Sequence, residues 1–229
     1  IKVVSGSTPK ALKFVSRLYA SVVKAGVYET KNIITAESAK IIENVQRDLN
    51  IALINELSML FNKLEINTQE VLNAANSKWN FQMFTPGLVG GHCIGVDPYY
   101  LVKKAKDVGF KTKLITQGRK INDDMSKYVV ERTTELMRKN KIKVEGSNTL
   151  ILGFTFKENL EDVRNSKVYD IYKHLKKLGS KITVYDPVAI PKEVKEMYKI
   201  NLSKELKNNF YDAVILAVAH YEFKKMKKN

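Results

Sequence analysis

The hydrophobic pattern of the chain divides it into a mainly helical part and a part in which strands alternate with helices. Thr8 and Pro9 favour a helix start, because threonine caps helices well and proline suits their first turn. Apolar residues at helical spacing extend this helix to about Lys24. Residues 27–36 then indicate a short extended piece.

The longest periodic segment runs from Thr35, its expected cap, to Leu64. A helix of about thirty residues would be about 45 Å long, which a small globule cannot cover alone. We interpret it as either a spine between domains or a dimer interface. Its apolar stripe contains Ile41, Ile42, Val45, Leu49, Ala52, Leu53, Leu57, Leu60, Phe61 and Leu64.

Three further helices are expected before residue 146. A short one is capped at Asn67 or Thr68, and another begins at Asp97 and Pro98 with Asp97 as its N-cap. Residues 111–142 are helical again, in one piece or two. Between the first two of these helices lies a loop rich in glycine.

From about residue 148 the pattern changes to strand, helix, strand, helix, strand. The strands are expected at 148–154, 181–187 and 212–220, and the helices at 166–179 and 191–199. This order indicates right-handed crossovers and a parallel sheet. The fold class is therefore α/β, with a helical domain over 35–146 and a Rossmann-like domain over 147–229.

The composition is that of an ordinary globular protein, with 44% hydrophobic and 28% charged residues. One cysteine fits a reducing compartment, so we expect a cytoplasmic protein, and the apolar stretches are too short to span a membrane. The net charge of +15 comes from 33 Lys and only 6 Arg, spread along the chain. That pattern favours a solvated surface over nucleic-acid binding.

Cys93, the single cysteine, lies in a permissive loop with Gly87, Gly90, Gly91 and Gly95. A lone cysteine is usually a small buried hydrophobe. Here the glycines let backbone approach a ligand closely, and the start of the following helix favours a thiolate. Cys93 is therefore also a candidate nucleophile.

Lys40 and Asn44 are four residues apart and share a helix face. Together they could hold an oxyanion, or they could form a solvated helix edge. No spacing of His and Cys indicates a metal site.

Lys157 and Arg164 follow the first strand of the parallel sheet, where ligands of such folds bind. The loop holds one glycine where a dinucleotide-binding fingerprint needs three, so it does not match that motif. Two interpretations of the loop remain: a phosphate-binding loop and an ordinary surface loop. Asp186 lies at the end of the second strand. It could accept a hydrogen bond from a ribose, or it could be a turn residue before Pro187.

Four stretches in order resemble the nucleotide-sugar 6-dehydrogenases, the UDP-glucose and UDP-N-acetylhexosamine dehydrogenase family. They are VVSGSTP, ESAKIIENVQRDLNIALINEL, PGLVGGHCIGVDPYYL and LGFTFKENLEDVRNS. The sequence after Cys93 is most similar to the branch acting on UDP-N-acetylglucosamine, UDP-N-acetylgalactosamine or UDP-N-acetylmannosamine. Such enzymes oxidise the sugar C6 alcohol to a carboxylate with NAD, in polysaccharide biosynthesis.

The resemblance implies a catalytic role for Cys93, which attacks the C6 aldehyde to give a thiohemiacetal and then a thioester. It implies that Lys40 and Asn44 hold the C6 oxygen, and that Asp97 orients water and polar groups there.

The resemblance also implies binding roles. Gly90 and Gly91 would present backbone amides to the substrate, Lys157 would bind the UDP-sugar, and Arg164 would reach toward the cofactor. Members of the family dimerise through the helix that corresponds to residues 35–64.

Two differences from the family pattern affect the prediction. The N-terminal domain that binds most of the NAD is absent before Ile1, so residues 1–34 are expected to be its tail and a connector. The chain also stops soon after the third strand of the sheet. We therefore expect the central and C-terminal portion of an enzyme, inactive by itself. The alternatives are a non-catalytic UDP-sugar-binding or dimerisation fragment and a nucleic-acid binder.

Overall fold

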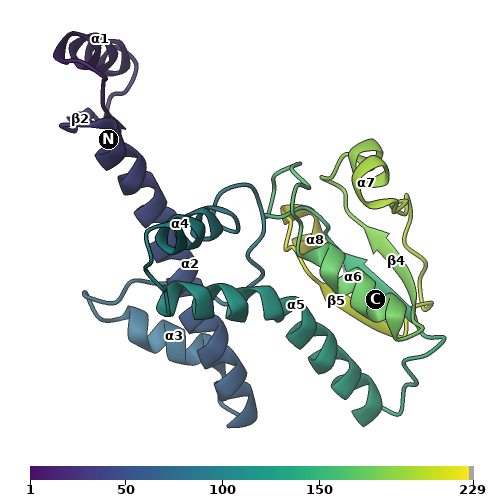
Figure 1. Ribbon diagram of the computed structural model, residues 1–229. Helices are drawn as coiled ribbons and strands as arrows, with labels where there is room; N and C mark the ends of the chain where they lie inside the picture. The colour runs from purple at the N-terminus through teal and green to yellow at the C-terminus, as the bar shows by residue number, and fades with distance from the viewer. Residues whose placement is uncertain (227–229) are drawn as a thin grey trace.

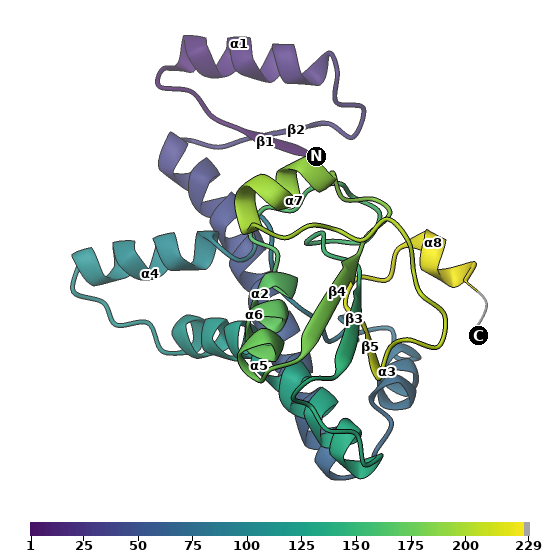
Figure 2. The same ribbon diagram turned by 90° about the vertical axis from the view of Figure 1, so that its right-hand side faces the viewer.

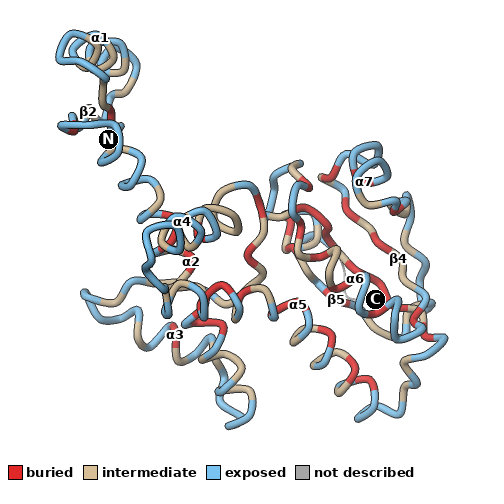
Figure 3. Tube along the Cα trace, in the orientation of Figure 1, coloured by how far each residue is buried: buried red, intermediate tan, exposed pale blue. Residues whose placement is uncertain are grey.

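A long helix, α2 (Ile33–Lys63), connects a small N-terminal unit to the rest of the chain in the computed structural model, which describes residues 1–226. The last three residues of the predicted C-terminal domain lie outside this range. Figure 3 shows buried residues gathered in the sheet domain and where α2 crosses α5, whereas the N-terminal unit is mostly exposed. The main cores therefore lie in the last two parts of the chain.

The N-terminal unit consists of β1 (Lys2–Val4), α1 (Pro9–Ala20) and β2 (Val27–Glu29), with the two strands parallel. The predicted start of α1 is confirmed, since Thr8 Oγ1 accepts a hydrogen bond from the Ala11 amide at 3.1 Å. No residue of α1 is buried. The unit stands apart from the sheet domain, at the far end of α2, in Figure 1.

Helix α2 is continuous over 31 residues, but its predicted cap is wrong. Asn32, in extended backbone, caps it by accepting a hydrogen bond from the Thr35 amide at 2.8 Å. The expected extended piece therefore ends earlier, at β2. Because Asn32 lies three residues before Thr35, the helix begins at Ile33 and Thr35 falls within its first turn.

The other helices of the central part are α3 (Thr68–Asn76), α4 (Asp97–Asp107) and α5 (Leu114–Lys139). Asn67 caps α3, as expected, and α5 is one uninterrupted helix. Asp97 is not the cap of α4; Val96 takes that position without a side-chain hydrogen bond. The Asp97 carboxylate is used elsewhere, as described below.

A buried polar cluster joins α2 to α5. Asp48 accepts hydrogen bonds from Arg119 and, at 2.7 Å, from Asn122, and all three side chains are buried. Asn55 continues the cluster by donating to Asn122 at 2.8 Å. Burial raises the pKa of Asp48, and the Arg119 guanidinium opposes that shift. The crossing of the two helices thus depends on mutually paired polar groups.

The sheet domain contains the strands β3 (Asn148–Leu152), β4 (Lys181–Tyr185) and β5 (Ala213–Leu216), and the helices α6 (Val168–Lys177), α7 (Pro191–Tyr198) and α8 (Tyr221–Lys224). The strands are parallel in the order β4-β3-β5, which confirms the predicted α/β class. Figure 2 shows them side by side, with α6 lying along the sheet. The short helix α8 was not expected.

The core of the sheet domain extends into the helical part, because Val130 of α5 packs with Ile151, Ile171 and Ile215. Lys167, just before α6, also forms an ion pair with Asp123 of α5 at 2.8 Å. Helix α5 therefore fixes the sheet domain relative to α2. Within residues 1–226, no helix has the length and apolarity needed to cross a membrane.

Replacing Arg119 by Ala should destabilise the protein by about 3–5 kcal/mol, because it leaves the buried Asp48 carboxylate without its counter-charge. Urea denaturation followed by circular dichroism measures this loss. Arg132→Ala, which removes a partly exposed guanidinium from the same helix, is the control and should cost much less. Equal losses for the two variants would contradict the importance assigned to the cluster.

Candidate active site

The glycine-rich loop is held from both sides. Asn55 of the buried cluster donates to the Gly87 carbonyl oxygen at 3.0 Å and accepts from its amide at 2.8 Å. On the other side, the sheet domain approaches so closely that a Cβ at Gly90 would lie 2.6 Å from the Asn165 carbonyl oxygen, and one at Gly91 would lie 2.7 Å from the Phe156 ring. Gly91 also has a φ of +83°, which favours glycine.

Cys93 is half-buried and lies in a turn that leads into α4. Its carbonyl oxygen accepts hydrogen bonds from the amides of Val96 and Asp97 at 3.0 and 2.8 Å. The backbone of Cys93 is therefore fixed relative to the first turn of the helix. The residue is neither fully exposed nor enclosed in the core.

Lys40, Asn44 and Asp97 meet at a single oxygen atom. The Lys40 Nζ lies 2.5 Å, and the Asn44 Nδ2 lies 2.6 Å, from Asp97 Oδ2. Asn44 is buried, whereas Lys40 is 58% exposed, so only the lysine fits the description of a solvated helix edge. The two donors converge as they would have to on the oxyanion of a reacting carbonyl.

Two cations lie within electrostatic range of the Cys93 sulfur. The pKa of Lys40 is raised, mainly by its hydrogen bond to Asp97 and further by the charges of Asp97 and Cys93. The pKa of Arg164 is raised mainly by its hydrogen bond to Asp162, and Cys93 contributes to that shift as well. Positive charge from α2 and from the sheet domain therefore lies near Cys93.

A cavity of about 410 Å³ separates the glycine-rich loop from the loop that follows β3. Its volume is within the range of small-molecule sites, about 300–1,000 Å³. Gly90 and Lys157 both line this cavity, whereas Arg164 and Cys93 do not. Its lining consists of Ile51, Thr85, Pro86, Gly87, Leu88, Gly90, Thr155, Phe156, Lys157, Glu158, Lys167, Val168, Ala217 and Val218.

Several of these lining residues were not singled out from the sequence. Thr85, Pro86 and Leu88 surround Gly87, and Phe156 and Glu158 flank Lys157. Phe156 and Glu158 could have been found from their place after the carboxyl end of a parallel strand, whereas no strand directly precedes the other three.

Arg164 is held by Asp162 through several hydrogen bonds, with Nη2 2.6 Å from Asp162 Oδ2 and Nε 3.0 Å from Oδ1. It remains largely exposed. An exposed guanidinium can bind a phosphate. To do so, Arg164 would have to give up its hydrogen bonds to the Asp162 carboxylate.

The described residues contain no glycine-rich cradle for the pyrophosphate of a dinucleotide such as NAD. β1 is followed by one glycine, Gly6, and a Cβ there would lie 2.3 Å from the amide nitrogen of Leu12. Gly6 thus serves the packing of α1.

Asp186 proves to be a turn residue, one of the two alternatives left open. Its carboxylate is buried and accepts hydrogen bonds from the amides of Val188 and Ala189, both at 2.8 Å. It does not face solvent, where a ribose could reach it.

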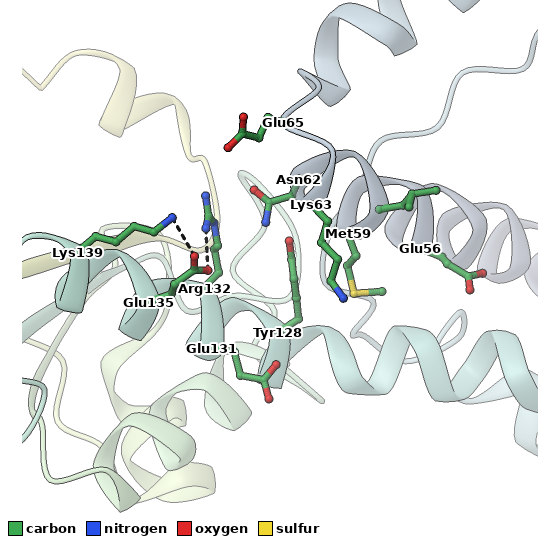
Figure 4. A pocket seen from close by; sticks show the side chains of 11 residues that line it. Glu56, Met59, Asn62, Lys63, Glu65, Tyr128, Glu131, Arg132, Glu135 and Lys139 are labelled. Atoms are coloured by element: carbon green, nitrogen blue, oxygen red, sulfur yellow. Dashed lines mark hydrogen bonds and ion pairs between the residues drawn. The ribbon is translucent and has the colours of Figure 1, made fainter.

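Another cavity, of about 1,090 Å³, lies between the ends of α2 and α5 and contains none of the predicted site residues. Figure 4 shows its charged lining, in which Glu135 pairs with Arg132 and Lys139. No cysteine, serine, threonine or histidine lines it. The chemistry therefore centres on the glycine-rich loop.

Comparisons with known proteins give matches over nearly the whole chain. Residues 34–124 match the central domain of the UDP-glucose/GDP-mannose dehydrogenase family, and residues 150–229 match its UDP binding domain. The chain is 50% identical to a UDP-N-acetyl-D-glucosamine 6-dehydrogenase of Salmonella typhi and 49% identical to Protein CapL of Staphylococcus aureus. These matches cover 98% and 100% of the chain, and 53% and 54% of the relatives.

A solved UDP-D-ManNAc dehydrogenase from Pyrococcus horikoshii has a TM-score of 0.87 and 31% identity, over 98% of this chain and 51% of that one. The chain thus spans about half the length of the relatives it matches. Both matched domains are of one family and together cover most of the sequence. The chain belongs to the UDP-glucose/GDP-mannose dehydrogenase family.

Proposed function

We propose that this chain supplies the central and C-terminal parts of an NAD-dependent UDP-N-acetylhexosamine 6-dehydrogenase of polysaccharide biosynthesis. The observation that carries the proposal is the convergence of Lys40 and Asn44 on one oxygen of Asp97, four residues after Cys93. A nucleophile, two oxyanion donors and a neighbouring cavity are the parts that oxidation through a covalent intermediate needs. The matched domains and the named relatives support the substrate class.

In the proposed reaction the C6 alcohol loses a hydride and a proton and becomes an aldehyde. The Cys93 thiolate adds to the aldehyde carbon, and the resulting oxyanion accepts hydrogen bonds from Lys40 and Asn44. Loss of a second hydride from C6 gives a thioester, and water then breaks the C–S bond to release the carboxylate and the thiolate. NAD, when bound, accepts both hydrides, one per molecule.

Asp97 has a positioning role in this scheme. Its carboxylate holds both donors before substrate arrives, so they need little rearrangement when the oxyanion forms. Because its amide also bonds to the Cys93 carbonyl oxygen, the donors and the nucleophile share one attachment point.

The UDP part of the substrate is assigned to the 410 Å³ cavity. Lys157 would attract the diphosphate, Gly90 would let it approach the backbone, and Arg164 would contact the cofactor on the Cys93 side. This cavity is formed wholly by residues of this chain. We therefore expect that the chain by itself, although inactive, binds UDP-sugars.

We also propose a homodimer through α2. Ile42, Leu53 and Leu60 are all exposed, and their spacings of 11 and 7 residues return them to one face of the helix. Such a continuous apolar stripe is typical of a helix that packs against another. The stripe supports the interface interpretation of this helix alongside its role as a connector.

Replacing Cys93 by Ala in the whole polypeptide that carries this chain should lower the rate of uronic acid formation by a factor of about 10³ or more, since the nucleophile is lost. Chromatography of the UDP-sugar products measures it. An unchanged melting temperature shows that the variant is folded. Acid production at the wild-type rate would rule out the covalent route.

Lys157→Met should raise the dissociation constant of UDP by a factor of about 10, because one charge-assisted hydrogen bond is lost. Isothermal titration calorimetry measures the constant. Lys176→Met, on the exposed side of α6, is the control and should leave it unchanged. If both variants bind UDP as the wild type does, the cavity is not the UDP site.

Leu53→Glu should shift the protein from dimer to monomer, because it places charge in the centre of the apolar stripe of α2. Light scattering after size-exclusion chromatography gives the mass. Since the Leu53 side chain is 54% exposed in the chain, the monomer should remain folded. A dimer that persists in this variant would place the interface elsewhere.

A further inference from the structure

Three strand ends meet beside the UDP cavity, and each contributes to one buried cluster. Thr155 follows β3, Asp186 follows β4, and His220 follows β5. The side chains of Asp186 and His220 are fully buried, and neither residue lines the cavity. What these two residues hold is the loop above them, which carries Phe156 and Lys157.

His220 contacts this loop as a hydrogen-bond acceptor. The backbone amide of Asn159 donates to His220 Nδ1 at 2.9 Å. Nδ1 must then carry a lone pair, so in the neutral ring the proton is on Nε2. That nitrogen lies 3.1 Å from Asp186 Oδ2 and 3.3 Å from Thr155 Oγ1, which are both acceptors for it. The three contacts therefore require the same tautomer.

Asp186 holds the start of the loop. Its Oδ2 accepts from the amides of Phe154 at 2.5 Å and Thr155 at 3.1 Å. Burial alone raises the pKa of Asp186, but the bonds from backbone amides outweigh it and the pKa is lowered. The carboxylate is thus ionised at neutral pH and binds its donors strongly.

The middle and the end of the loop are held by Thr155 and by residues 220–221. Thr155 Oγ1 donates to the Lys157 carbonyl oxygen at 2.9 Å. Asn159, whose φ of +59° is unusual for a residue other than glycine, accepts from the Tyr221 amide through its Oδ1 at 2.9 Å. The amide of Asn159 and its side chain therefore both depend on residues 220–221.

A buried histidine often has only a structural role, in which its polar atoms satisfy other core groups. Here the acceptor nitrogen reaches outward to an exposed loop residue. Between the two anchored ends lie the Phe156 ring, which packs against Gly91, and Lys157. Releasing the Asn159 end would move both groups relative to the cavity.

We propose that His220, seated on Asp186, is a positioning residue that fixes Phe156 and Lys157 in the shape that binds the UDP part of the substrate. The proposal rests on the proposed function of the cavity. It predicts that UDP affinity depends on the acceptor at the Nδ1 position of residue 220.

Two substitutions of His220 test the hydrogen bonds of its two ring nitrogens separately. His220→Asn keeps an acceptor near the Nδ1 position and loses the donor to Asp186. His220→Gln keeps a donor near the Nε2 position and loses the acceptor for Asn159. We expect the Gln variant to raise the dissociation constant of UDP by about tenfold, and the Asn variant by threefold at most.

Stability measured on the same samples distinguishes positioning from a purely structural role. The Asn variant should lose at least as much stability as the Gln variant, because it leaves the buried Asp186 without its ring partner. Affinity losses that follow stability losses, or two variants that both bind UDP like the wild type, would overturn the proposal. His174→Asn, exposed on α6, is the control and should change neither quantity.

Measurements on the unliganded protein separate this proposal from the proposed function. Hydrogen exchange at the Asn159 amide should rise at least tenfold in the Gln variant and stay close to wild type in the Asn variant. Long-range ¹H–¹⁵N spectra should show His220 protonated at Nε2. If these results hold while the wild-type protein and Lys157→Met bind UDP equally, the anchor is real and the assignment of the cavity fails. Unchanged exchange in the Gln variant would overturn the anchor itself.

Discussion

The interaction on which the site depends is the pair of hydrogen bonds that Lys40 and Asn44 donate to Asp97 Oδ2. It ties the first residue of α4 to α2 across more than fifty residues of chain. The Asp97 amide in turn holds the Cys93 carbonyl oxygen, so the position of the thiol follows from the same contact. Since α2 is continuous through this region, the contact gives the glycine-rich loop a helical reference.

The glycine-rich loop is also the meeting place of the two larger parts of the molecule. Asn55 holds it to the helical part, and Gly90 and Gly91 allow the sheet domain to approach it within contact distance. Helix α5 and the pair of Lys167 with Asp123 then fix the distance between these parts. The cavity beside the loop is therefore shaped by tertiary packing as much as by the loop itself.

The periodicity of the chain was enough to predict the fold class and nearly every element. Thr8 and Asn67 cap their helices as their residue types suggest, because capping depends on local geometry. The caps of α2 and α4 were predicted wrongly for different reasons. Thr35 was expected to cap α2, but Asn32 caps it and Thr35 lies within its first turn. The carboxylate of Asp97 was expected to cap α4 but is taken by donors from a helix far away in sequence.

Candidate site residues could be chosen from the sequence where residue type and spacing mark them. Groups that come together only through tertiary contacts could not be found in this way. Cys93, Lys40, Asn44 and Lys157 stood out by type and spacing. The cluster of His220 and Asp186 could not be found that way, because its partners are backbone amides of two separate loops, after β3 and after β4.

The most direct test of the account is mass spectrometry of the peptide that contains Cys93, after acid quenching of the whole protein during turnover with NAD and a UDP-N-acetylhexosamine. A covalent sugar adduct on Cys93 that disappears as the carboxylate product accumulates is the predicted result. Product formation with Cys93 unmodified at every time point would contradict the role assigned to this thiol.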